Sequence, residues 1–106
     1  MSPALLAWAL TVIVEVTVVA WVYAGERLRM ALACAVATTA TNLTMNLVLF
    51  PNVRSITSYL LIGEIGAVVI EAAVYFAVSK ERDLGRALIA SAIANSASFA
   101  AGMLLW

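Results

Sequence analysis

Apolar residues fill four long segments of this 106-residue chain, and short polar or charged stretches separate them. The segments cover about residues 3–24, 30–50, 57–78 and 87–106. Each is about 20 residues long, the length that an α-helix needs to cross a hydrocarbon core of about 30 Å. A strand of a membrane barrel needs about half that length and alternates polar with apolar residues, an alternation missing here. We therefore expect an all-α, polytopic integral membrane protein, with residues 1–106 forming one domain of four transmembrane helices in two hairpins.

The composition narrows the classes of function. Hydrophobic residues make up 65% of the chain and charged residues 11%, whereas soluble domains carry about 25% charged residues. This excludes a water-soluble enzyme, and six basic against six acidic side chains leave no positive excess to attract nucleic acid. We expect the lipid bilayer as the main partner, and no nucleic acid.

The chain lacks the residue types that most cofactor sites and catalytic sites need. The chain has no His and a single Cys34, so the commonest transition-metal ligand is missing and no thiolate cluster or intrachain disulfide can form. Neither a Ser/His/Asp set nor a Gly-rich phosphate loop is present. We expect no cofactor and no enzymatic activity; Cys34 is expected to be a buried packing residue.

Basic residues concentrate in two of the three connecting loops. The loop after segment 30–50 carries only Arg54, whereas the other two loops carry Arg27, Arg29, Lys80, Arg82 and Arg86. Because basic loops stay in the cytoplasm, we expect loops 25–29 and 79–86 to be cytoplasmic and both termini to lie outside. The expected location is the inner or plasma membrane of a bacterium or archaeon.

The two halves of the chain resemble each other. Residues 33–41 align with residues 90–98 at an offset of 57, and each half carries a glutamate within its first apolar segment, Glu15 and Glu71. Two hairpins of the same orientation would form a parallel repeat, related by an axis along the membrane normal. The alternative is chance, since alanine-rich segments align readily with one another.

Each apolar segment has its polar residues on one helical face, at spacings of three, four or seven. The stripes are Thr11 and Glu15; Thr38, Asn42 and Asn46; Glu64 and Glu71, extended by Thr57 and Tyr75; and Ser91, Asn95, Ser98 and Gly102. With lipid outside the bundle, four such stripes are best accommodated when they face a common interior. The polar stripes therefore predict a shared polar site inside the bundle.

Three carboxylates lie within the apolar segments, with no basic side chain at the same depth. An unpaired carboxylate at the bilayer centre costs at least about 2.5–3.5 kcal/mol. The acids must therefore be protonated and hydrogen-bonded, face water, or hold a cation, and intramembrane acids are commonly functional. The candidate site for a proton, ion or substrate consists of Glu15, Glu71, Glu64, Asn42, Asn95 and Thr38, with the identity of any metal left open. Asparagines of this kind also serve as simple hydrogen bonds between helices, worth about 0.6 kcal/mol each, and the small residues of segment 87–106 are expected to serve helix packing.

The first segment resembles the small multidrug resistance family. The resemblance rests on the chain length, the four segments and Glu15 within Ile13-Val14-Glu15-Val16. It implies a four-helix dimer that exchanges protons for cationic compounds at that glutamate. The third segment departs from the family because it lacks an aromatic-rich motif and carries two carboxylates, so we use the resemblance as an analogy for mechanism and assign no family.

Two functions remain open from the sequence. The first is a small transporter or channel, expected to be a homo-oligomer, that moves a proton or cation through the carboxylate site. The second is a non-catalytic subunit of a larger membrane complex, in which the acids pair with basic residues on a partner helix.

Overall fold

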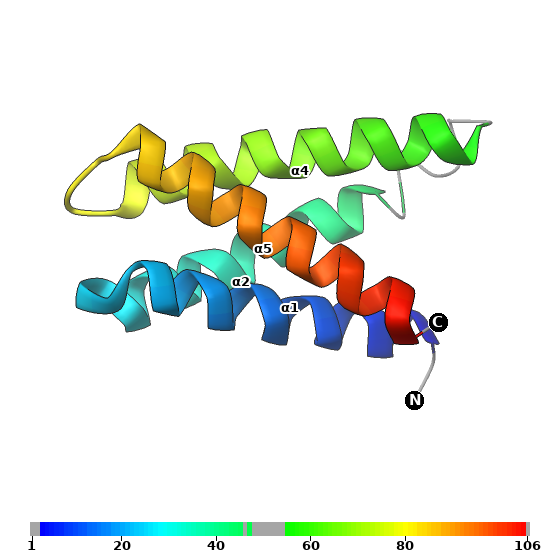
Figure 1. Cartoon of the computed structure of the whole chain (residues 1–106), viewed down its shortest axis with the longest axis horizontal. Coiled ribbons are helices and arrows are strands. Elements are labelled where there is room, and N and C mark those ends of the chain that lie inside the picture. Colours follow the sequence, from blue (N-terminus) through cyan, green and yellow to red (C-terminus); the bar gives the residue numbers. More distant parts are fainter. Residues whose placement is uncertain (1–2, 46, 48–54, 106) are drawn as a thin grey trace.

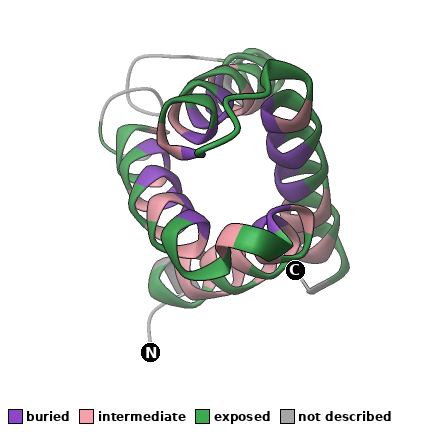
Figure 2. Cartoon of the chain, turned by 90° about the vertical axis from the view of Figure 1, so that its left-hand side faces the viewer, coloured by how far each residue is buried: buried purple, intermediate pink, exposed green. Residues whose placement is uncertain are grey.

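In the computed structural model, which describes residues 3–45, 47 and 55–105, these residues form a bundle of four long α-helices (Figure 1). The elements in chain order are α1 (Pro3–Val22), the short 3-10 helix η1 (Ala24–Glu26), α2 (Arg27–Thr44), α4 (Ile56–Val78) and α5 (Leu84–Leu105). Helix α1 packs against α2 and α5, and α4 packs against the same two helices. The four helices therefore form a ring, with α1 opposite α4 and α2 opposite α5, and their buried faces turn inward (Figure 2).

Three helices of the described chain are long and apolar enough to cross a membrane. The apolar stretches are Leu5–Val22, Leu61–Val78 and Leu84–Leu104, and the bundle is 40 Å along its longest axis. Over its described residues α2 is not among them, because it begins with Arg27 and Arg29 and carries several threonines. The all-α fold and the packing as hairpins are confirmed, and the three helices indicate an integral membrane location.

The helix boundaries follow local capping groups. Ser55 caps α4, its hydroxyl accepting a hydrogen bond from the Ser58 amide at 3.3 Å. The Asp83 carboxylate accepts a hydrogen bond from the Arg86 amide at 3.1 Å in the first turn of α5, as N-terminal caps do. Helix α5 thus begins three residues before the predicted segment 87–106, and α2 begins three residues before segment 30–50.

The loops at residues 23–27 and 79–83 lie at the same end of the bundle and contact each other. The Glu26 carboxylate accepts hydrogen bonds from the Ser79 hydroxyl at 2.7 Å and from the Lys80 amide at 2.9 Å. These two bonds hold the pKa of Glu26 below its ordinary value. The two loops that the basic residues predict to be cytoplasmic therefore share one end of the bundle.

An apolar core fills the half of the bundle next to these loops. Its large members are Val19, Tyr23, Met30 and Tyr75, and small residues of α5 complete it. The rings of Tyr23 and Tyr75 pack edge to face with centroids 6.4 Å apart. The residues of α5 in this core are Ala87, Ala90 and Ala94, all fully buried, as expected for small residues that serve close packing.

Candidate functional site

Two carboxyl groups lie inside the bundle, near the middle of its length. Glu15 on α1 and Glu71 on α4 are each only 1% exposed. The helices that carry them are diagonal in the ring, and the two carboxyl groups lie close together beside one polar cavity that both of them line. Glu15 and Glu71 each lie within the first helix of their hairpin, and the two acids are neighbours in space. The polar stripes predicted a shared site of this kind.

Neutral side chains from α2 and α5 hold the carboxyl group of Glu15. The Thr38 hydroxyl donates a hydrogen bond to Oε1 at 3.2 Å. The Ser98 hydroxyl donates to Oε2 at 2.9 Å. Both carboxyl oxygens of Glu15 therefore accept a hydrogen bond from a neighbouring helix.

Three donors surround Glu71. The Thr41 hydroxyl donates to Oε2 at 3.1 Å, and the Tyr75 hydroxyl donates to Oε1 at 3.3 Å. The Asn95 amide nitrogen donates to the same Oε1 at 3.4 Å and also to the Ser91 carbonyl at 2.9 Å. Counted over the described residues, Glu71 thus accepts one more side-chain hydrogen bond than Glu15, and the additional donor is Tyr75, one turn along the same helix.

The contacts of the two acids follow the same pattern in both hairpins. Thr38 and Asn95 lie 57 positions apart in the sequence, and each bonds the acid of its own hairpin. Thr41 and Ser98 also lie 57 positions apart, and each bonds the acid of the other hairpin. Each acid is therefore bonded by residues of both hairpins, and Glu71 has Tyr75 of its own helix as an additional donor.

A polar cavity of about 220 Å³ adjoins the acid pair. Its lining includes Thr11, Asn42, Glu64 and Phe99 in addition to the acids and their donors. All four of these residues lie on the side of the acids away from the loops at 23–27 and 79–83. The apolar core occupies the other side, so the cavity has the acids at its inner end and is large enough for several water molecules.

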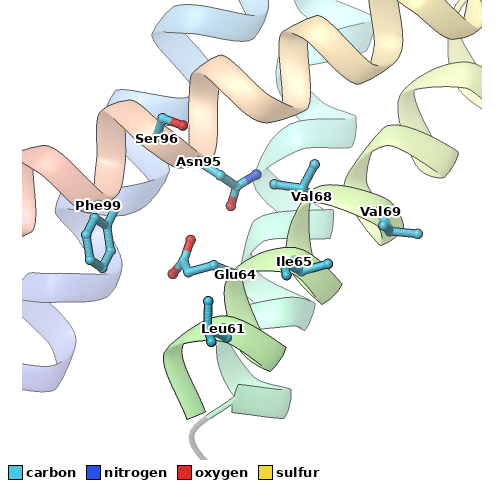
Figure 3. Close-up of a pocket in the computed structure, with 8 residues that line it drawn as sticks. All are labelled: Leu61, Glu64, Ile65, Val68, Val69, Asn95, Ser96 and Phe99. Carbon is cyan, nitrogen blue, oxygen red and sulfur yellow. The ribbon is translucent and has the colours of Figure 1, made fainter. Parts of the chain in front are cut away.

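Glu64 lies where this cavity meets a second, largely apolar hollow. This groove of about 460 Å³ runs between α4 and α5 and is lined by Leu61, Ile65, Phe99 and others (Figure 3). The Glu64 side chain extends from α4 toward Asn95 and Phe99 of α5 in this view. It is half-buried and lines both hollows. Glu64 is therefore the acid of the interior that also borders the outer surface of the bundle.

The structure brings most of the predicted site residues together. Thr38 and Asn95 contact the acids directly, whereas Asn42 and Glu64 line the cavity beside them. Asn46, predicted on the same stripe as Asn42, lies outside the described residues. Three contacting residues were not predicted as site residues: Thr41, Tyr75 and Ser98. For Tyr75 and Ser98 a signal existed, since each shares a helical face with a predicted residue.

The arrangement suits a proton or a small cation better than a closed metal centre. Within the described ranges 3–45, 47 and 55–105, no group of three or more Cys, Asp or Glu side chains gathers closely enough to hold a metal ion. The two carboxyl groups and the four hydroxyls that bond them nevertheless offer oxygen atoms, which proton and hard-cation chemistry prefer. Comparison with protein-family models, curated proteins and solved structures finds no match to this chain.

Proposed function

We propose that this protein is a small membrane transporter or channel that moves a proton or cation through the acid pair of Glu15 and Glu71. One observation carries the proposal: two buried carboxyl groups lie close together at the inner end of a polar cavity. In the described part of the bundle, only neutral groups donate to them. Acids without a basic partner at membrane depth need a proton, water or a cation.

The acids and the residues around them have four roles in this proposal. Glu15 and Glu71 bind the transported ion, and Thr38 and Asn95 hold their carboxyl groups in place. Asn42 and Glu64 line the approach from the end of the bundle that carries the N-terminus of α1. The packed rings of Tyr23 and Tyr75 close the path on the loop side, so passage requires this apolar core to open or rearrange.

The number of membrane spans and the side of the membrane on which the loops lie are part of the same proposal. We infer that α2 and the residues after it form the fourth membrane span, with loops 25–29 and 79–86 in the cytoplasm. The matching contacts of the two hairpins support a parallel internal repeat with α1 opposite α4. Four helices alone enclose a narrow interior, so a homo-oligomer is the expected form of a conduit.

The alternative is a membrane subunit whose acids pair with basic residues of a partner helix. Burial of Glu15 and Glu71 inside their own bundle disfavours this role for them, because a partner helix could reach neither carboxyl without separating the four helices. Native mass spectrometry after gentle extraction distinguishes the two functions. A homo-oligomer supports transport, whereas a stoichiometric foreign subunit supports the alternative.

The direct test is ion flux with the purified chain in lipid vesicles. Uptake of protons, Na⁺ and K⁺ would be followed under an imposed membrane potential for the wild type and for Glu71→Gln. We expect the wild type to move at least one of these ions and Glu71→Gln to match protein-free vesicles while remaining folded. The matched control is Glu81→Gln, an exposed loop acid, which should retain full flux. Undiminished flux through folded Glu71→Gln would overturn the proposal.

A further inference from the structure

We propose that the ion bound by the acid pair is a single proton, carried by Glu15 and donated in a hydrogen bond to Glu71. This inference rests on the proposed function and names its ion. It begins from the closeness of the two carboxyl groups, which line one cavity and accept hydrogen bonds from the same two helices. An ionised carboxylate can only accept hydrogen bonds, so a hydrogen bond between two carboxyl groups requires one proton between them.

The neighbouring helices hold the two carboxyl groups close together. On α2, Thr38 bonds Glu15 and Thr41, one turn further on, bonds Glu71. On α5, Ser98 bonds Glu15 and Asn95, one turn before it, bonds Glu71. Each of these helices therefore bonds both acids from adjacent turns, which keeps the carboxyl groups at one level of the bundle and limits how far they can separate.

No positively charged group faces Glu15 and Glu71 within the described bundle, so nothing there would balance two ionised carboxylates. The titratable groups that face the pair are Cys34 from α2 and Glu64 and Tyr75 from α4, and each is neutral or negative. The described residues of α5 that bond the pair are Asn95 and Ser98, and both are neutral. Two negative charges in contact repel strongly where little water screens them. Paired carboxyl groups in such surroundings retain one proton, as in other carboxyl dyads.

The number of hydrogen-bond donors differs between the two acids. This difference indicates which of them carries the proton. Among the residues that the structure describes, three side chains donate a hydrogen bond to Glu71 and two donate one to Glu15. The additional donor is Tyr75, and the position 56 residues earlier, where the first hairpin would have its counterpart, is Val19. Because hydrogen bonds donated to a carboxylate stabilise its ionised form, Glu71 is the better site for the negative charge. The proton therefore resides on Glu15.

Infrared spectroscopy of the whole chain in lipid vesicles tests this assignment, because a protonated carboxyl group has its own carbonyl-stretch band. At neutral pH we expect one such band in the wild type and in Glu64→Gln, the control that removes the third intramembrane acid. Glu15→Gln should lose the band, since Glu71 then has three donors and no negative neighbour. Absence of the band in the wild type, or its survival in folded Glu15→Gln, would overturn the inference.

A milder pair of variants gives an answer even where Glu15→Gln does not fold. Ser98→Ala removes the hydrogen bond that the Glu15 carboxyl accepts at 2.9 Å, so the band should shift to higher frequency. Ser96→Ala is the matched control, because Ser96 is exposed on the same helix, and its band should not move. An unmoved band in Ser98→Ala would contradict the assignment to Glu15.

Different results would overturn the proposal of transport and the proposal that the bound ion is a proton. Flux in the wild type without a protonated-carboxyl band would leave transport standing and show that the ion is not a proton. The band pattern expected here without flux of any ion would leave the protonated acid pair standing and overturn transport.

Discussion

At the scale of single residues, the buried acids depend on hydrogen bonds from neutral side chains. Each of these donors is itself buried or half-buried, so removing an acceptor strands a polar group away from water. A buried donor left without a partner costs about 1–3 kcal/mol. The acids therefore contribute to the packing of the bundle as well as to its proposed chemistry.

Glu71→Ala should destabilise the protein more than Glu71→Gln does. Alanine leaves Thr41, Tyr75 and Asn95 without their shared acceptor, whereas glutamine keeps one carbonyl oxygen in the same place. We expect Glu71→Ala to lose roughly 2 kcal/mol or more relative to Glu71→Gln, measured from thermal unfolding in detergent by circular dichroism. Equal stability of the two variants would show that the hydrogen bonds at Glu71 contribute little.

The sequence predicts the acids and part of their surroundings, and it does so for a physical reason. Helical spacing places Glu15, Thr38, Glu71 and Asn95 on inward faces, because lipid excludes polar side chains from the outer ones. Thr41 was harder to predict, since hydroxyls within helices commonly bond their own backbone, and Thr41 also does so to the Thr38 carbonyl. Which donor bonds which acid depends on how the four helices pack in the ring. The spacing of residues along one helix does not contain that information.

At the scale of elements, small residues allow α5 to pack closely against its neighbours. Ala90 is fully buried on the inner face, and Ala92 is exposed on the outer face. Close approach of helix backbones through small residues is a common basis of packing within membranes. This face of α5 therefore leaves little space for a larger side chain.

Ala90→Leu should destabilise the bundle and Ala92→Leu should not. The additional carbon atoms at position 90 would meet a filled core, at a cost of about 1–3 kcal/mol. At position 92 they would face outward. Thermal unfolding of both variants in the same detergent provides the comparison, and equal midpoints would contradict the packing of α5 described above.

The contact between the two loops should depend on pH through Glu26. Its pKa in the folded protein is lowered, chiefly by the hydrogen bonds from the Lys80 amide and the Ser79 hydroxyl, so its contribution to stability is present above the ordinary value of 4.5. That contribution is lost as the pH falls through the lower value of the folded protein. Glu26→Gln should be less stable than the wild type at neutral pH, and the difference should shrink in acid. Unfolding followed across this pH range checks it, and a difference that does not change with pH would contradict it.

Element boundaries were predicted less well than element types. The sequence places Arg27 and Arg29 in a loop, because charged residues leave the hydrocarbon region, yet α2 begins at Arg27. A helix can continue into the polar interface beyond the hydrocarbon, and hydropathy does not register that extension. The start of α5 had a local signal in Asp83, whose type favours helix N-terminal caps.

At the scale of the whole molecule, the ring of helices places both charged loops at one end. The described ends of α1 and α5 lie together at the other end (Figure 1). Basic loops favour the cytoplasmic side. The polar cavity is therefore proposed to lie toward the outside of the cell and the apolar core toward the cytoplasm. The ring order could not be obtained from the sequence, because two hairpins can dock in more than one arrangement with the same polar interior.

Cysteine labelling in intact cells should confirm this orientation. In a Cys34→Ser background, Gly25→Cys and Lys80→Cys should resist a membrane-impermeant thiol reagent until the cells are opened. Thr57→Cys, near the start of α4, should react from outside. Position 25 tolerates a side chain, since a Cβ there meets no atom within 4 Å. Labelling of position 25 or 80 in intact cells would reverse the proposed orientation.

The decisive measurement is ion flux through the purified chain in vesicles, made on the wild type and on the three single glutamine variants of the intramembrane acids. We predict that Glu15→Gln and Glu71→Gln each abolish the flux of the wild type, because the two acids form one binding unit. Glu64→Gln should keep a measurable flux, since that residue lines the cavity without bonding the pair. Undiminished flux in folded Glu15→Gln or Glu71→Gln, or no flux of any ion in the wild type, would contradict transport through the acid pair.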